Sequence, residues 1–332
     1  MASSSAETNP TPPAPTPPEP ASPAVSILIV GFRSKAFILE CIASIEAHCR
    51  AIAHEIRLIN NSDDDTEAAV AALYPHVRIV PSEGNIGFGA ANNRLAAAAR
   101  APRLLLLNPD TKLKDDAVAH LFDLAALHPD AGAWGGQMVS SDGVADTGVI
   151  IPTIATLAKQ LVGVRKSLHW QVPTDGGRAP MRVDVLSGGF MMVPTKVWRR
   201  LGGFDESFFL YSEEVDLFLR MRQAGLAVWM TPNAEIVHYT GSGDAYSLVR
   251  VFYKTVGQAH FARKHWGPIG SLVGRSLIWA LAVQRWAGGM VIAAVKGHAG
   301  RRAMQRAYKP IVSRPWRWWK GYAGRTSVRF DS

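Results

Sequence analysis

The sequence predicts an α/β protein in which an open, mostly parallel sheet is flanked by helices and followed by a helical, basic C-terminal extension. The first observation is the run Val25–Val30, whose β-branched apolar residues are typical of a strand buried on both faces. The second is the alternation of such runs with helical segments over residues 25–107, which favours right-handed crossovers between parallel strands. The third is the loss of this alternation near residue 245.

Three segments divide the chain. Residues 1–23 are mainly Pro, Ser, Thr and Ala, a composition that cannot offset the entropy lost on ordering, so we expect a disordered leader; it lacks the basic start and apolar centre of a signal peptide. Residues 24–244 are the α/β domain, and residues 245–332 are the extension. Within the domain we expect, in order, a strand at 25–30, a helix at 37–47, a strand at 55–60, a helix at 66–73, a strand at 77–80, a helix at 89–99 and a strand at 103–107.

Charge is distributed unevenly between these segments. From residue 245 onward 16 Lys and Arg residues stand against one acid, whereas the rest of the chain holds 26 acidic and 20 basic residues. A basic, Trp-rich end on a mildly acidic body indicates an anionic surface as partner. Nucleic acid is not expected as a partner, because no recognised binding module is present. Cys41 and Cys49 have neither metal-ligand spacing nor a disulfide framework, which favours a reducing compartment.

Polar and glycine-rich loops follow the first four predicted strands, at 31–34, 60–66, 83–89 and 108–111. Ligands of open α/β sheets bind at the carboxyl ends of the strands, so we expect these loops to line one crevice. Each loop alone is also ordinary turn chemistry. The segment 85–94 is Gly-rich at a helix start, which suits a close approach of the backbone to phosphate. It has neither the Walker spacing nor the dinucleotide fingerprint, so neither NTP hydrolysis nor NAD binding is supported.

Three carboxylates, Glu213, Glu214 and Asp216, lie within four positions. Because they repel one another and are costly to desolvate, they indicate a bound cation, a proton to manage, or full solvation. The simpler interpretation is that acids in a first helical turn complement the helix dipole, and that Asp216 pairs with Arg220 four residues later. Glu213 and Glu214 follow the aromatic run at 208–211, a partly dry setting that raises carboxylate basicity and suits a general base.

Asp110 and His238 are candidate ligands for a divalent cation. Asp110 follows a buried strand of leucines and emerges at its end, where a carboxylate suits Mg²⁺ or Mn²⁺. The alternative is a Pro-Asp turn with Thr111 as a helix cap. His238 ends a predicted strand beside a Thr-Gly-Ser-Gly loop. A single His is usually structural, but this position favours a contact to metal or diphosphate.

At this point the ordered motifs resemble a known family. The chain is similar, over roughly residues 25–243, to the family 2 glycosyltransferases of the GT-A fold, which are inverting enzymes that use nucleotide-diphosphate sugars. It most resembles bacterial rhamnosyltransferases of surface-polysaccharide and cell-wall assembly. The matching motifs are the first strand and its loop, Asn60-Asn61-Ser62, the run from Asn85 to Arg94, Asn108-Pro109-Asp110-Thr111, Ser187-Gly188-Gly189-Phe190, the run from Gly202 to Phe209, Glu213-Glu214-Val215-Asp216, and the run from His238 to Ser242.

The resemblance implies a role for each matching residue. Glu214 falls where the family places its catalytic base, with Glu213 and Asp216 as lesser candidates. Asp110 becomes the metal-binding end of a DxD-type motif whose first position is Asn108, and His238 a second metal or diphosphate contact. Asn60 stands where the family often has an Asp that contacts the nucleobase. The implied nucleotide-sugar-binding residues are Gly31, Phe32, Asn60, Asn61, Asn85, Gly87, Arg94, Asn108, Gly188 and Gly189.

The implied reaction is transfer of rhamnose from dTDP-rhamnose to a hydroxyl of a polyprenyl-diphosphate-linked glycan acceptor, with Mg²⁺ or Mn²⁺ as cofactor. Transfer of another sugar, such as galactofuranose or mannose, is one alternative. A catalytically silent protein that binds sugar nucleotides is the other, although the presence of Asp110, Glu214 and His238 together argues against it.

The extension is predicted to attach to a membrane. The apolar stretch 276–295 has Arg285 at its centre, and an Arg in mid-bilayer costs at least about 2.5 kcal/mol. Arg275, Arg285 and Lys296 fall within about 80° on one helix. We therefore expect a helix lying in the membrane interface with this basic stripe toward the headgroups, at the cytoplasmic face of the inner (plasma) membrane. The alternatives are a break at Gly288-Gly289 and an extension packed on the α/β domain.

Overall fold

The computed structural model describes residues 22–145, 148–164, 169–170, 178–239, 247–296 and 299–322. Residues 1–21 of the predicted leader lie outside these ranges. The strands are β1 (Val25–Gly31), β2 (His54–Asn60), β3 (Arg78–Val80), β4 (Arg103–Leu107), β5 (Thr111–Leu113), β6 (Ala133–Val139), β7 (Gly148–Val149), β8 (His169–Trp170), β9 (Met181–Arg182), β10 (Phe190–Pro194) and β11 (Val228–His238). The helices are α1 (Lys35–His48), α2 (Thr66–Leu73), α3 (Phe88–Ala98), α4 (Ala117–Leu127), α5 (Ile154–Leu161), α6 (Thr195–Leu201), α7 (Glu213–Gln223), α8 (Leu248–His265), α9 (Gly267–Lys296) and α10 (Ala299–Ser313), followed by a short 3₁₀ helix, η2 (Pro315–Arg317).

All seven elements predicted over residues 25–107 are present, with ends within two residues of the predicted ones. The main sheet has the strand order β3-β2-β1-β4-β10-β6-β11-β5, with β9 beside β11. Strands β3, β2, β1 and β4 are parallel, as predicted. Strand β10 then runs antiparallel to both β4 and β6, and β5 and β9 run antiparallel to β11. The sheet is therefore mixed, with its parallel half at the N-terminal side.

Alternate residues of the central strands face two separate cores. Along β1, Leu28 and Val30 pack with residues of α3, α6 and α7 on one face. Ile27 and Ile29 pack with residues of α1, α2 and α4 on the other. Every residue of β1 is buried, as expected for a strand covered by helices on both faces. The first core continues into α8, α9 and α10, so it joins the α/β domain to the extension.

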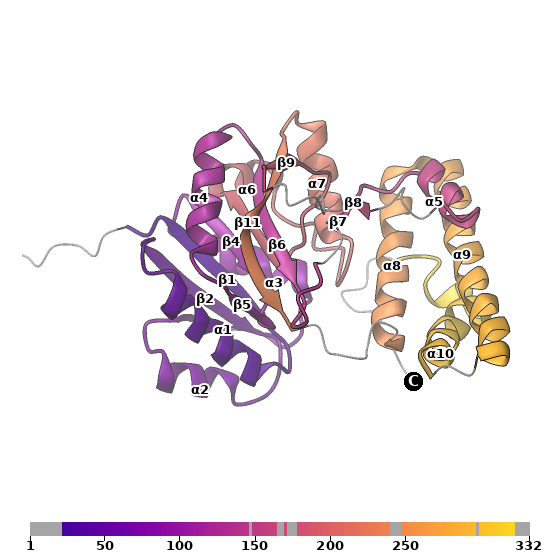
Figure 1. The fold of residues 1–332 in the computed structure, drawn as a ribbon, viewed down its shortest axis with the longest axis horizontal. Helices are drawn as coiled ribbons and strands as arrows, with labels where there is room; N and C mark the ends of the chain where they lie inside the picture. The colour runs from indigo at the N-terminus through magenta and orange to yellow at the C-terminus, as the bar shows by residue number, and fades with distance from the viewer. Residues whose placement is uncertain are drawn as a thin grey trace, which may run out of the picture.

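The extension is a group of helices to one side of the sheet, with α5 packed against α9 (Figure 1). Helix α9 runs unbroken through Gly288 and Gly289, so a helical hairpin broken at this point is wrong. Among the residues described, no helix is both long and apolar enough to cross a membrane. The prediction that Arg275 belongs to an exposed basic stripe is also wrong. Its guanidinium stacks on the ring of Trp319 at 4.9 Å and donates to the Trp319 carbonyl oxygen at 2.9 Å.

The chain turns back after η2 and packs against α8, with Trp318 and Tyr322 fully buried. The hydroxyl of Tyr322 reaches the backbone of Leu210 in the α/β domain. The extension thus packs on the α/β domain, which was one of the alternatives from the sequence.

Candidate active site

The carboxyl ends of the parallel strands meet at one edge, as predicted. Gly31 at the end of β1 lies opposite Asn60 at the end of β2. The backbone N–H of Asn61 donates to the Gly31 carbonyl at 2.8 Å, and its side-chain amide donates to the Gly87 carbonyl at 3.2 Å. A Cβ on Gly31 would lie 2.7 Å from the Ile38 side chain, so glycine allows α1 to approach closely. The first three loops therefore form one hydrogen-bonded rim, which we call the donor rim.

Side chains of the donor rim mostly shape the loops that carry them. The Asn60 amide donates to the Ser62 carbonyl and the Asp64 carboxylate, both at 3.1 Å, and its oxygen accepts from the Ser62 N–H at 3.2 Å. The Asn60 amide, for which the resemblance implies a nucleobase contact, is thus already engaged within its own loop. The Asn85 side chain accepts from the Gly87 N–H at 3.1 Å.

Two arginines, Arg33 and Arg94, lie beside the same rim. The Arg33 guanidinium is 5.3 Å from the ring centroid of Phe32, a half-exposed residue directly after β1. Arg94 lies on α3, where its guanidinium is 3.8 Å from the Glu83 carboxylate; both side chains face solvent. Neither side chain is locked in a buried pair, so both can reorient toward an anionic ligand.

Asn108 and the Gly188-Gly189 pair come together where β4 meets β10. The Asn108 N–H donates to the Gly189 carbonyl at 3.0 Å, and a Cβ on Gly189 would lie 2.9 Å from the Asn108 amide nitrogen. A Cβ on Gly188 would lie 3.1 Å from the Phe88 ring. Small residues are therefore needed here because β10 passes directly beside the end of β4.

Asp110 and His238 lie side by side, although 128 positions separate them in the sequence. Strand β5 pairs antiparallel with the end of β11, with Thr111 opposite His238. The His238 Nε2 atom is 3.4 Å from an Asp110 carboxylate oxygen, and the Tyr239 N–H donates to the Asp110 carbonyl at 2.8 Å. Within the described ranges, no three His, Cys, Asp or Glu side chains gather as metal ligands do. Thr240, Gly241 and Ser242 of the His238 motif lie outside those ranges.

The start of α7, which carries Glu213, Glu214 and Asp216, lies close to the donor rim. The Phe88 N–H donates to the Phe209 carbonyl at 3.0 Å, and a Cβ on Gly87 would lie 2.4 Å from that same oxygen. At the second residue of α3, the ideal Cβ position of Gly89 is 3.8 Å from the Glu213 Cβ. The two glycines of the phosphate-loop candidate therefore let the loop before α7 come close to the start of α3.

Glu213 and Glu214 occupy different environments. Glu213 is 3% exposed, and one of its carboxylate oxygens has no hydrogen-bond partner. Burial, and secondly the charge of Glu214, raise the pKa of Glu213 well above its ordinary value. Glu214 is only half buried, and burial raises its pKa too, against the opposing charge of Lys254. For both residues the direction of the pKa shift is the one expected from the aromatic run before α7. A negative charge on one of these neighbouring carboxylates disfavours ionisation of the other. Glu214 is the more exposed of the two, so it is the one that ionises more easily.

Asp216 is a buried ionic anchor. Its carboxylate accepts from Arg220 at 2.8 Å, from Lys264 at 2.6 Å and contacts His265 Nε2 at 2.7 Å. Burial alone would raise the pKa of Asp216, but these three partners outweigh it and lower the pKa to about 2. The predicted pair with Arg220 is confirmed. Lys264 and His265 of α8 carried no signal in the sequence, because 48 and 49 positions separate them from Asp216.

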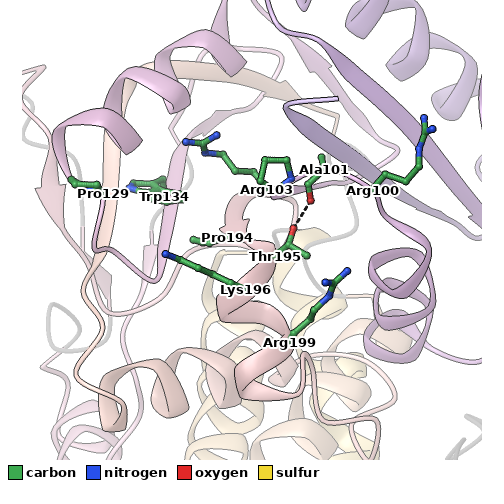
Figure 2. A pocket seen from close by; sticks show the side chains of 10 residues that line it. Arg100, Ala101, Arg103, Pro129, Trp134, Pro194, Thr195, Lys196 and Arg199 are labelled. Atoms are coloured by element: carbon green, nitrogen blue, oxygen red, sulfur yellow. Dashed lines mark hydrogen bonds between the residues drawn. The ribbon is translucent and has the colours of Figure 1, made fainter. Parts of the chain in front are cut away.

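A basic pocket of about 540 Å³ lies elsewhere on the domain (Figure 2). It opens at Arg103, where β4 begins and β10 ends, whereas Asn108 follows the opposite end of β4. Arg100, Lys196 and Arg199 also line it, and the Thr195 hydroxyl in its wall donates to the Ala101 carbonyl at 2.7 Å. Because β4 spans about 16 Å at 3.3 Å per residue, this pocket is separate from the candidate active site.

Comparison with known sequences is consistent with the motifs. The model of a family described as "Glycosyltransferase like family 2" matches residues 23–251. The N-acetylglucosaminyl-diphospho-decaprenol L-rhamnosyltransferase of Mycobacterium tuberculosis is 28% identical over 257 residues, which cover 68% of this chain and 76% of the relative. The rhamnosyltransferase WbbL of Escherichia coli is 25% identical over 233 residues, covering 65% of this chain and 83% of that protein.

Solved structures share the fold. GalNAc-T7, solved with UDP, GalNAc and Mn²⁺, superposes with a TM-score of 0.53 at 15% identity, over 77% of this chain and 54% of that one. The mannosyltransferase PcManGT of Pyrobaculum calidifontis, solved with GDP-Man and Mn²⁺, superposes with a TM-score of 0.53 at 16% identity, over 91% and 84% of the two chains. The mixed sheet flanked by helices is therefore an architecture that known glycosyltransferases possess.

Proposed function

Because this chain belongs to family 2 of the glycosyltransferases and is a glycosyltransferase, we propose that it transfers rhamnose from dTDP-rhamnose to a hydroxyl of a polyprenyl-diphosphate-linked glycan, with inversion. The observation that carries this proposal is the Glu213-Glu214 pair, a buried and a half-buried carboxylate at the start of α7, where the Cβ of Glu213 lies 3.8 Å from the ideal Cβ position of Gly89 in the donor rim. The choice of sugar and acceptor rests on the two rhamnosyltransferases to which the chain is similar.

In the proposed reaction Glu214 is the general base. Its carboxylate accepts the proton of the acceptor hydroxyl while the hydroxyl oxygen forms a bond to the anomeric carbon of the donor. The bond from that carbon to the diphosphate oxygen breaks on the opposite face, and the diphosphate leaves with the electron pair. Glu213 stays protonated beside Glu214, so the acceptor hydroxyl meets one negative charge rather than two.

The donor atoms of Asp110 and His238 fit a divalent cation of the oxygen-preferring kind. One partly exposed carboxylate with an imidazole nitrogen 3.4 Å away supplies two protein ligands. Mg²⁺ and Mn²⁺ commonly take their remaining ligands from phosphate and water, so two are sufficient. When bound, the cation would neutralise charge on the departing diphosphate. Asp110 and His238 would hold and orient it at the carboxyl end of β4.

A donor panel tests the proposed function. Purified protein is incubated with dTDP-rhamnose, UDP-galactofuranose or GDP-mannose, with N-acetylglucosaminyl-diphospho-decaprenol as acceptor, and with Mg²⁺, Mn²⁺ or EDTA. We expect turnover with dTDP-rhamnose that EDTA abolishes and either metal restores, measured by mass spectrometry of the lipid product. Turnover with a different donor would correct the sugar. Donor binding without product on any acceptor would instead indicate a silent sugar-nucleotide-binding protein.

We further propose that the extension seats the enzyme on an anionic membrane at its cytoplasmic face. An exposed apolar stripe runs along α9, formed by Ile269, Leu272, Val273 and Trp279, which are 80%, 54%, 41% and 39% exposed. At 100° per residue these four side chains fall within about 120° of the helix surface. An apolar stripe on an extension with a large excess of basic residues suits an interfacial helix on anionic lipid.

Acidic substitutions in the α9 stripe are expected to weaken this attachment. Each buried Leu or Ile contributes about 1.5–3 kcal/mol to insertion, so Ile269→Glu with Leu272→Glu should lower binding to phosphatidylglycerol vesicles by at least about tenfold. Vesicle co-sedimentation at low salt measures it. Leu73→Glu with Leu127→Glu is the matched control, because these leucines are 62% and 67% exposed on α2 and α4. Equal vesicle binding by the two double variants would contradict membrane attachment through the α9 stripe.

A further inference from the structure

The loop that leads into the catalytic helix has an unusual backbone. Tyr211 and Ser212, directly before Glu213, are two consecutive non-glycine residues with positive φ, 66° and 75°. Side chains other than glycine rarely adopt this region, so surrounding contacts must impose it. The Ser212 side chain makes no capping hydrogen bond to α7. The direction in which Glu213 and Glu214 leave the loop therefore depends on what packs around residues 207–212.

Helix α8 covers one side of this loop. A Cβ on Gly257 would lie 2.3 Å from the Tyr211 carbonyl oxygen and 3.0 Å from the Ser212 hydroxyl. The ring of His260, one turn later on α8, lies edge-on to Phe208 with a centroid distance of 4.6 Å. The α8 surface therefore fixes where the loop can lie, but it offers no hydrogen bond to Leu210 among the contacts described.

Tyr322 supplies that hydrogen bond from the far end of the extension. Its hydroxyl accepts from the Leu210 N–H at 3.3 Å and donates to the Leu210 carbonyl, so one oxygen satisfies both backbone groups of that residue. The Tyr322 side chain is fully buried, and its ring lies 6.5 Å from both Phe208 and Phe209. Buried backbone groups need partners, and here the partner lies 112 positions later in the chain.

His260 fixes the position of Tyr322 and ties it to the same loop a second time. The Tyr322 N–H donates to His260 Nδ1 at 3.3 Å, so the neutral ring carries its hydrogen on Nε2, which donates to the Ser207 hydroxyl at 2.9 Å. Burial lowers the His260 pKa, which favours this neutral form. Gly321 has φ 61°, and a Cβ there would lie 2.7 Å from the His260 backbone, so the approach requires glycine.

From this arrangement we propose that Tyr322 is a positioning residue for catalysis: it holds Leu210 and thereby the Tyr211-Ser212 backbone that aims the Glu213-Glu214 pair. The proposal rests on the proposed function of Glu214 as the base. It gives the extension a second role besides membrane attachment, because its last described residues complete the wall behind the catalytic helix. A change in the direction of the loop would move the carboxylates away from the acceptor hydroxyl. General-base catalysis tolerates little displacement between the two groups.

The test is Tyr322→Phe, which keeps the ring and removes only the hydroxyl. We expect amide hydrogen exchange over residues 207–214 to accelerate about tenfold, because Leu210 loses both partners. With the donor and acceptor that turn over in the panel, kcat should fall about tenfold or more while KM for the donor changes less than twofold. The acidic limb of the kcat profile should also shift, since the carboxylate pair moves in its surroundings.

Tyr308→Phe is the matched control. The Tyr308 hydroxyl accepts from Arg285 within the extension at 3.0 Å, away from the loop. It should alter neither exchange over 207–214 nor kcat. Ser207→Ala, an exposed substitution that cuts the His260 link, should move both readouts in the same direction as Tyr322→Phe but less.

Three outcomes would overturn the proposal: unchanged exchange in Tyr322→Phe, unchanged kcat despite faster exchange, or a fall in kcat matched by an equal loss of donor affinity. The exchange readout does not depend on any substrate. If Glu214→Gln itself turns over normally, the proposed function fails; if Glu214→Gln is inactive while Tyr322→Phe has normal kcat, only the positioning role fails.

Discussion

Glu214→Gln is expected to lower kcat by about 10²- to 10⁴-fold while leaving donor affinity within a few-fold of the parent. The amide keeps the size of the side chain but cannot take the acceptor proton, and general-base catalysis contributes about that much. The residues expected to hold the nucleotide sugar lie mainly on loops after β1, β2, β4 and the start of α3, so binding should persist. Single-turnover kinetics and calorimetric titration of dTDP-rhamnose measure the two effects separately.

Glu213→Gln makes the assignment of the base specific. Because Glu213 is buried with its pKa well above the ordinary value, the neutral amide resembles its native form. We expect Glu213→Gln to retain at least tenfold more turnover than Glu214→Gln. The control is Glu46→Gln, on α1 and away from the donor rim, which should turn over as fast as the parent. A loss equal for Glu213→Gln and Glu214→Gln, or near-normal turnover in Glu214→Gln, would contradict the assignment.

The assignment of Glu214 as the base also predicts how turnover depends on pH. A general base acts only when deprotonated, so kcat/KM should rise with pH through the pKa of the base and level off above it. Because burial raises that pKa, the acidic limb should lie above 4.5, the ordinary value for Glu. A limb at or below 4.5 would indicate a solvated carboxylate.

Asp216→Asn is expected to lower the free energy of unfolding by about 3 kcal/mol. The change removes a fully buried negative charge from contact with Arg220, Lys264 and His265, and breaking a buried ion pair on one side costs about 3–5 kcal/mol. The lower end applies because Lys264 and Arg220 are partly exposed. Urea unfolding followed by circular dichroism gives the value. Asp123→Asn, an exposed acid on α4, should change it by less than about 0.5 kcal/mol.

The pH dependence of stability separates the Asp216 charge from its packing. The folded-state pKa of Asp216 is lowered to about 2 from an ordinary 3.8, so its contribution is fully present above about pH 4 and is lost as pH falls toward 2. The difference of about 1.8 between these two pKa values corresponds to about 2.5 kcal/mol of stability lost over that window. The Asn variant should lack this part of the acid sensitivity. If the parent and the variant lose stability in parallel between pH 4 and 2, the ionic anchor contributes little.

The parallel half of the fold was predictable because each of its elements is encoded locally. Buried parallel strands are continuous apolar runs, and β1, β2 and β4 are such runs separated by helical periodicity. The antiparallel strand β10 inserts between β4 and β6 through contacts that leave no periodic trace in the sequence. Helix α5 packs on α9 across more than a hundred positions, and no local pattern indicates that pairing.

In the candidate site, too, residues marked by a local sequence pattern could be predicted, and residues defined by contacts distant in the sequence could not. Glu213, Glu214 and Asp110 stand out because carboxylates beside aromatic runs or after a leucine strand are unusual locally. Arg275 was assigned to an exposed basic stripe from helix spacing alone, but spacing cannot reveal that Trp319 lies over it. The role of Tyr322 could not be predicted from the sequence. Its hydrogen-bond partner is the backbone of Leu210, and a backbone N–H or carbonyl group leaves no mark in the sequence.

The bond between Leu210 and Tyr322 also has a consequence for the timing of biosynthesis. At about 5–20 residues per second, a ribosome makes Tyr322 on the order of ten seconds after Leu210. For most of that interval the nascent chain already holds the strands that form the donor rim, and α7, but not the hydroxyl that hydrogen-bonds to the loop before α7. On the proposed role of Tyr322, the loop before α7 therefore reaches its final position late in translation, and a message cut short just before codon 322 should yield a protein that keeps the donor rim and α7 but lacks the hydroxyl that holds Leu210.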